Sequence, residues 1–181
     1  GKVYAGQNTF VGVHRDNDLD DCVGCHMNSS VARNPPNSDA TEKHTFLPEV
    51  QDCNQCHAGS SFPDLGNAPS GNFRDILQLK AELLEAMQAY ATTGDLPIDS
   101  PVFYDGSAYP YWFKDNGMGA NYGNRYRDFD FDMLTAAYNY TVADKDPAGY
   151  IHNAAYIQQL LYDSIEVMGG EPGLFPPGRL P

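Results

Sequence analysis

Two short motifs contain all four cysteines of the chain. Residues 22–26 read CVGCH and residues 53–57 read CNQCH, so a histidine directly follows the second cysteine of each C-x-x-C pair. Thiols at this spacing can form thioethers to the vinyl groups of a porphyrin, and the next histidine is then placed to ligate the iron. The motif residues are Cys22, Cys25, His26, Cys53, Cys56 and His57. We therefore expect two covalently bound c-type haems with His26 and His57 as proximal ligands.

Two other uses of the cysteines are open. Two C-x-x-C pairs lie near zinc-ribbon spacing, in which four thiolates would close one tetrahedral structural site. Two disulfides are the second alternative. Neither gives a role to the histidines that follow the cysteine pairs, and this favours haem.

The chain has five histidines, so three remain for the two distal positions. His14 precedes the first motif, His44 precedes the second, and His152 falls opposite the apolar face of a predicted helix. Each is either an iron ligand or an exposed histidine, and we predict ligation for all three. The alternative sulfur ligands, which would raise a haem potential, are Met87, Met118, Met133 and Met168.

Ligation by two histidines fills both axial positions of an iron and leaves electron transfer as the accessible chemistry. Because one histidine is left over, we hypothesise that it serves a haem of a neighbouring copy. Such a ligand would link subunits head to tail into a fibre with a continuous row of haems.

The secondary structure predicted to position these residues changes along the chain, from loops in the N-terminal part to helices in the C-terminal part. Residues 27–69 are rich in Asn, Ser, Pro and Gly, which predicts loops that bound haem would order. Apolar spacing and capping signals predict helices over about 71–94, 133–143 and 147–168. Residues 95–128 are predicted to be an aromatic-rich loop that covers a haem edge, forms a subunit contact or packs locally. The predicted fold class is mainly α with extensive loops: a haem-filled N-terminal half with little regular structure and three helices in the C-terminal half.

We predict a single dihaem domain over residues 1–181. It comprises haem-attachment loops at 1–70, a helical part at 71–170 and an extended tail at 171–181. The alternating acids Asp128, Asp130 and Asp132 suit a helix N-terminus better than a metal site, because the helix dipole favours negative charge there.

The formal net charge of −13 argues against nucleic-acid or anionic-membrane binding and favours a basic protein partner. No apolar run reaches the length of a membrane span, and the first residues are not a signal peptide. Because haem c is attached outside the cytoplasm, we expect an exported protein, periplasmic or at the cell surface, whose signal sequence has been removed. Asn28 and Asn139 begin sequons that are open to glycosylation.

Three parts of the chain resemble the multihaem c-type cytochromes of anaerobic respiration and extracellular electron transfer. They are residues 12–14 with 22–27, residues 44–48 with 53–57, and residues 152–156 with 160–164. The resemblance implies closely stacked haems, haem-filled loops with a few helices, and distal-ligand positions at His14, His44 and His152. This chain departs from the family in haem number, since relatives usually carry four or more. It is thus a minimal member, a repeating subunit or a fragment.

The leading function is electron transfer to redox partner proteins or extracellular acceptors. A dihaem peroxidase or a reductase of nitrogen or sulfur oxyanions is the enzyme alternative, and it needs one iron with an open site. The C-x-x-C-K variant of some nitrite reductases is absent from the sequence. A structural or adhesive polymer that carries haem is a third alternative.

Overall fold

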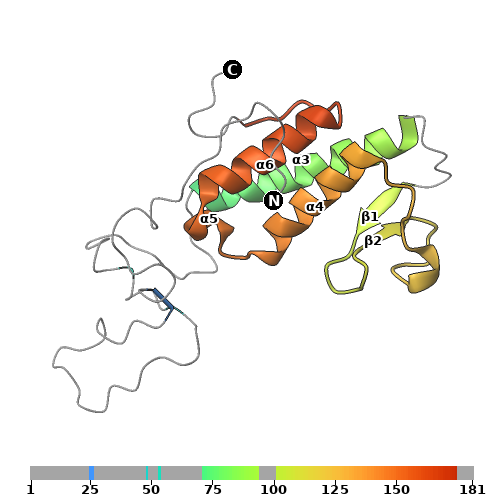
Figure 1. The fold of residues 1–181 in the computed structure, drawn as a ribbon, viewed down its shortest axis with the longest axis horizontal. Helices are drawn as coiled ribbons and strands as arrows, with labels where there is room; N and C mark the ends of the chain where they lie inside the picture. Colours follow the sequence, from blue (N-terminus) through green and yellow to red (C-terminus); the bar gives the residue numbers. More distant parts are fainter. Residues whose placement is uncertain (1–24, 27–47, 49–52, 54–70, 94–100, 175–181) are drawn as a thin grey trace, which may run out of the picture. The chain divides into compact units, whose positions relative to one another are not determined.

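The chain divides into two compact units, one of residues 11–70 and one of residues 1–10 with 71–181. The structure is a computed structural model, and it describes residues 25, 26, 48, 53, 71–93 and 101–174. The helices and strands labelled in Figure 1 all belong to the second unit. The described residues are mainly helical, which confirms the predicted fold class.

Helix α3 spans Gly71–Thr93 and forms where the apolar spacing predicts it. Its buried stripe is made of Ile76, Leu79, Leu83, Ala86, Met87 and Ala91. Leu77, which the sequence pattern also assigns to this stripe, is 49% exposed instead. The core face of α3 is therefore rotated slightly from the one read from the sequence.

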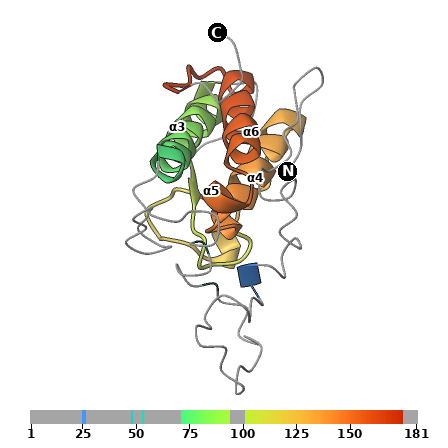
Figure 2. The same cartoon turned by 90° about the vertical axis from the view of Figure 1, so that its left-hand side faces the viewer.

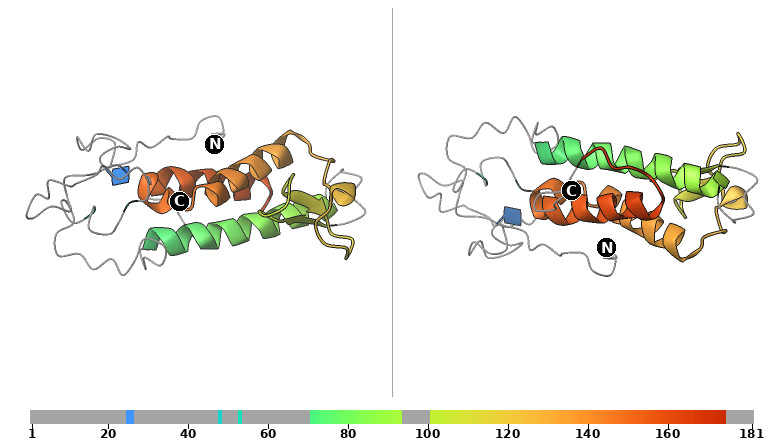
Figure 3. Two further views of the ribbon diagram at one scale, coloured as in Figure 1. Left: turned by 90° about the horizontal axis from the view of Figure 1, so that it is seen from below. Right: turned by 90° about the horizontal axis from the view of Figure 1, so that it is seen from above.

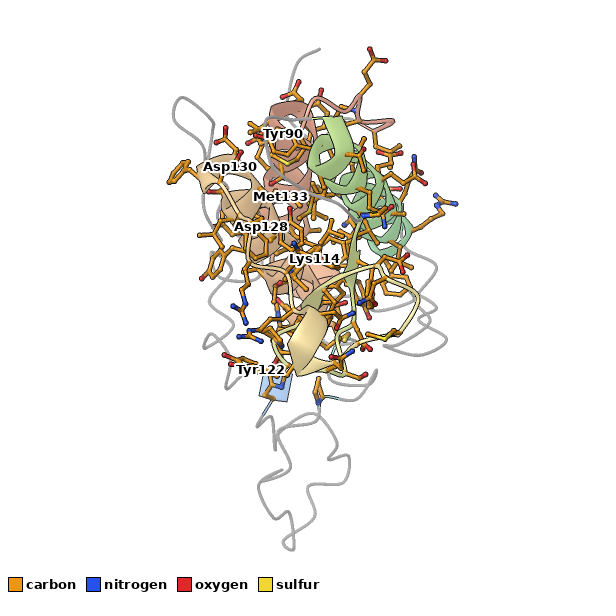
Figure 4. The ribbon with its side chains drawn as sticks, turned by 90° about the vertical axis from the view of Figure 1, so that its right-hand side faces the viewer. Tyr90, Lys114, Tyr122, Asp128, Asp130 and Met133 are labelled. Carbon is orange, nitrogen blue, oxygen red and sulfur yellow. The ribbon has the colours of Figure 1, made fainter. Side chains whose placement is uncertain are left out.

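Helix α4 spans Phe131–Lys145 and begins directly after Asp130, with Asp132 in its first turn. Asp130 caps it, because its carboxylate Oδ1 accepts the backbone N–H of Met133 at 2.8 Å and Oδ2 accepts the hydroxyl of Tyr90 (Figure 4). Asp128 pairs with Lys114 at 2.6 Å. The predicted role of these acids at a helix N-terminus is confirmed at Asp130, and the tyrosine ties that cap to α3.

The predicted single helix over 147–168 is wrong, because two helices occupy it. Helix α5 spans Gly149–His152, and helix α6 spans Ala154–Val167. Asn153 separates them: its N–H donates to the carbonyl of Gly149 at the end of α5, while its side chain accepts the N–H of Tyr156 and caps α6. One apolar stripe runs through both helices, and that continuity hid the break.

Helix α6 ends where the sequence predicts. Gly169 has a φ of +77°, and the N–H of Gly170 donates to the carbonyl of Ile165 at 2.9 Å. Of the predicted tail, residues 171–174 are described and lie outside helices. The N–H of Gly173 donates to the Glu82 carboxylate at 2.9 Å, so this part of the tail contacts α3.

The predicted loop over 95–128 contains a small hairpin. Strand β1, Val102–Tyr104, pairs antiparallel with strand β2, Trp112–Lys114, with Phe103 opposite Phe113, and a 3₁₀ turn follows at Tyr122–Asn124. Tyr104 and Trp112 make edge contacts with each other and with Tyr140 of α4, at ring-centroid distances from 4.8 to 5.3 Å. Of the three roles predicted for residues 95–128, which are haem cover, subunit contact and local packing, Tyr104 and Trp112 have the last.

Helices α3, α4 and α6 pack against one another and enclose the core, as the end-on and side views show (Figures 2 and 3). The hairpin packs on α3 through β1, and α5 contacts both α3 and α6. Among the described residues, no helix is long and apolar enough to cross a membrane. The three-helix core therefore holds the α4–α5–α6 junction, where His152 lies.

Candidate functional site

Three of the six motif residues are described: Cys25, His26 and Cys53. All three are half-buried and have helical backbone conformation. Half-exposed thiols followed by an imidazole are a donor set that fits covalent haem with an axial histidine. Cys22, Cys56 and His57 lie outside the described residues.

Among the three predicted distal ligands, only His152 is described, since His14 and His44 lie outside that part of the chain. His152 is the last residue of α5, and its side chain is 49% exposed. Its ring nitrogen Nδ1 lies 2.8 Å from Oδ1 and 2.9 Å from Oδ2 of Asp146. The periodicity prediction that His152 faces away from the apolar core is therefore consistent with its exposure.

Asp146 ends α4 and is itself held in place by the backbone. Its N–H donates to the carbonyl of Val142, its side chain accepts the N–H of Ala148 at 3.2 Å, and its carbonyl accepts the N–H of Gly149 at 3.0 Å. Asp146 is thus the C-cap of α4, whereas the residue that precedes α5 is Ala148, which makes no side-chain cap hydrogen bond. The pairing with His152 was missed, because it depends on the shape of this turn.

Helix α5 is fixed on its other sides as well. The ring of Tyr150 meets that of Phe73 edge-on at 5.1 Å, which ties α5 to the first turn of α3. Gly149 is buried, and a Cβ there would lie 3.3 Å from Ile157 Cγ1, so α5 and α6 approach closely. These contacts determine where the imidazole of His152 emerges.

A second polar network joins α3, α4 and the hairpin. Asp144 accepts a hydrogen bond from Lys80 Nζ and another from the hydroxyl of Tyr104, both at 2.8 Å. Burial by itself would raise the pKa of Asp144, but the hydrogen bonds from Lys80 and Tyr104 outweigh burial and hold the pKa below its ordinary value. Burial and the Asp144 hydrogen bond raise the pKa of Tyr104. This network ties three elements together.

Within the described part of the chain, no group of three or more His, Cys, Asp or Glu side chains is placed to hold a metal ion. The candidate site residues that the structure does place are therefore the two helical motif fragments in one unit and the Asp146–His152 pair in the other.

Comparison with known proteins finds relatives that carry haem. The chain is 29% identical to the C-type polyheme cytochrome OmcB of Geobacter sulfurreducens in two strains, over 80% of this chain and 20% of each relative. It is also 29% identical to the C-type polyheme cytochrome OmcC of the same organism, over 80% of this chain and 19% of the relative. The chain thus spans about a fifth of the length of these curated relatives.

No protein-family model matches the chain, and no solved structure matches it. The relatives agree with the resemblance that the cysteine and histidine motifs carry. By its sequence, the chain is a relative of the multihaem c-type cytochromes.

Proposed function

We propose that this chain transfers electrons through two covalently attached c-type haems. The observation that carries the proposal is the pair of C-x-x-C-H motifs, which accounts for every cysteine. Similarity to polyhaem cytochromes supports haem-based electron transfer over an enzyme activity. Because haem c is attached outside the cytoplasm, the proposed site of action is the periplasm or the cell surface.

In this proposal the haems supply a reversible one-electron couple, and the chain supplies attachment and axial ligands. The thioether residues are Cys22, Cys25, Cys53 and Cys56, the proximal ligands His26 and His57, and the distal candidates His14, His44 and His152. Distal histidines keep substrates and oxidants off the irons. The bound haems would supply electron transfer in which no bond is made or broken.

The proposal is tested by the mass and the spectra of the purified protein. We expect two added haem masses that survive denaturation, together with low-spin spectra that cyanide and peroxide leave unchanged. A colourless protein that contains zinc would overturn the haem proposal. A high-spin haem that binds cyanide would instead indicate the dihaem peroxidase or reductase.

The proposal includes self-association of the chain. Three histidines for two distal positions leave one for a haem of a second copy, as a head-to-tail contact would provide. The surface of α4 supports a protein contact, because its exposed residues from Phe131 to Tyr138 are all large and apolar. They are Phe131 at 68%, Leu134 at 54% and Tyr138 at 56% exposure. The occupant proposed for this α4 face is another copy of the chain.

Two exposed leucines on different helices make a matched test of this contact. Leu134→Lys lies on the α4 face, and Leu77→Lys lies on α3 at a similar exposure of 49%. We expect the holoprotein to form particles larger than one chain in light scattering, and Leu134→Lys but not Leu77→Lys to reduce their size. A monomeric wild type, or equal particle sizes in all three proteins, would exclude the α4 face as the contact.

A further inference from the structure

We propose that Asp146 is a positioning residue for His152: its carboxylate accepts the Nδ1–H of the imidazole and so directs Nε2 toward a haem iron. This inference rests on the proposed function, in which His152 is a distal ligand. It adds a second residue to that site, one that acts through the histidine and does not touch the iron.

The geometry of the pair carries the inference. Both carboxylate oxygens of Asp146 lie within hydrogen-bond distance of Nδ1, at 2.8 and 2.9 Å. A carboxylate is an acceptor only, so a neutral imidazole that bonds to it must carry its proton on Nδ1. The lone pair is then on Nε2, which is the nitrogen that would meet iron. Histidines that bind metals commonly donate their other N–H to a carboxylate in this way.

The backbone around the pair restricts the imidazole in space. The N–H of His152 donates to the carbonyl of Ala148 at 2.9 Å, and α5 ends one residue before the Asn153 cap of α6. Asp146 is anchored separately by the N–H of Ala148. Because both partners are fixed to the same turn, the carboxylate sets the ring orientation and does not follow it.

The simpler interpretation is that Asp146 and His152 form a surface ion pair that only stabilises the fold. The size of the expected effects distinguishes this interpretation from a positioning role. The side chains are 49% and 31% exposed, and exposed ion pairs contribute little to stability. Loss of a carboxylate that orients a metal-bound histidine typically weakens the metal site by roughly 10–100-fold. If the pair only stabilises the fold, loss of the Asp146 carboxylate should change stability slightly and leave the haem unaffected. If Asp146 positions His152, the same loss should change the properties of the haem.

A carboxylate behind a histidine also makes the imidazole a stronger donor, which favours the ferric iron over the ferrous. Asp146→Asn keeps the size of the side chain but removes its charge. The amide can also donate to Nδ1, and this would move the proton to Nε2 and oppose ligation. Both effects favour the reduced haem.

The experiment compares the reduction potentials and low-spin spectra of the holoprotein with those of Asp146→Asn. Glu85→Gln is the matched control, since it removes one negative charge from an exposed position on α3. We expect Asp146→Asn to shift the reduction equilibrium of one haem about tenfold toward the ferrous form, which is 59 mV for a one-electron couple. Glu85→Gln should leave both potentials close to those of the wild type. Equal shifts in the two variants would overturn the inference, because charge alone would explain them.

His152→Gly separates the inference from the function on which it rests. If His152 is a ligand, this variant loses one low-spin signal and regains it when imidazole is added. If His152→Gly leaves both haem spectra unchanged, the proposed ligand role fails and the inference fails with it. If His152→Gly changes the spectrum while Asp146→Asn matches the wild type, the ligand role stands and the positioning role of Asp146 is wrong.

Discussion

Two tyrosines of the hairpin region differ in what their hydroxyls meet. The hydroxyl of Tyr126 is buried with no hydrogen-bond partner among the described residues, and burial, followed by the charges of Asp128 and Asp130, raises its pKa to about 12. The hydroxyl of Tyr104 donates to Asp144 at 2.8 Å. The Tyr126 hydroxyl therefore destabilises the folded state, and the Tyr104 hydroxyl stabilises it.

This contrast predicts opposite effects of the same substitution. Tyr126→Phe removes a buried polar group without a partner and should raise the free energy of unfolding by about 1 kcal/mol. Tyr104→Phe removes one of the hydrogen bonds that Asp144 accepts, leaving that from Lys80, and should lower the free energy of unfolding by about 1–2 kcal/mol. Denaturant unfolding of the two holoproteins at neutral pH measures both. If the free energy of unfolding falls equally in Tyr126→Phe and Tyr104→Phe, the Tyr126 hydroxyl has a stabilising partner.

Asp144 gives the fold an acid-sensitive contact. Its pKa is held below the ordinary value, so its contribution to stability is present above the unfolded pKa, near 3.9, and is lost as pH falls through the folded pKa. Asp144→Asn should therefore lower the free energy of unfolding by about 1–2 kcal/mol at pH 7. The difference from the wild type should shrink below about pH 4. A difference that stays constant from pH 7 to pH 2 would mean that the charge of Asp144 contributes nothing.

At the scale of elements, the sequence predicts α3 because it combines an apolar stripe with recognisable ends, and it predicts the start of α4 from the acids there. It does not predict the strands, since Val102–Tyr104 and Trp112–Lys114 are too short to show an alternating pattern. It also misses the break at Asn153, because a polar residue off the apolar face is equally compatible with a continuous helix. Turn geometry and packing, which periodicity does not encode, decide both cases.

The same limits apply to the candidate site. The C-x-x-C-H residues are recognised from local spacing alone, and Cys25, His26 and Cys53 are half-buried with helical backbone. The position of His152 off the apolar face follows from helical periodicity. Its partner Asp146 does not, since the contact is made across a turn between two helices.

Substitutions at Asn153 test whether the break between α5 and α6 is needed for the Asp146–His152 contact. Asn153→Ala removes the side-chain acceptor for the N–H of Tyr156 and should lower the free energy of unfolding by about 1 kcal/mol. Alanine also favours a continuous helix, so the variant should turn His152 away from Asp146 and alter one haem spectrum. Asn153→Asp, which keeps a capping oxygen, should retain both properties. Equal stability of the alanine and aspartate variants would show that this cap does not matter.

At the scale of the whole molecule, the net charge of the chain favours encounters with some proteins over others. The formal net charge is −13, and haem propionates would add to it. Such a charge attracts basic proteins and repels acidic ones over a distance that salt controls: about 30 Å at 0.01 M ionic strength and about 3 Å at 1 M. Electron exchange with a soluble partner should therefore depend strongly on salt.

We expect the bimolecular rate of electron transfer from the reduced holoprotein to a basic c-type cytochrome to fall at least tenfold between 0.01 and 0.5 M ionic strength, because screening removes electrostatic steering. Stopped-flow absorption at the haem bands measures this rate. An acidic acceptor of similar potential is the control, and its rate should rise with salt as repulsion is screened. If neither rate responds to salt, the net charge of the chain does not guide the encounter, and contact through an apolar surface such as the α4 face would have to control electron exchange.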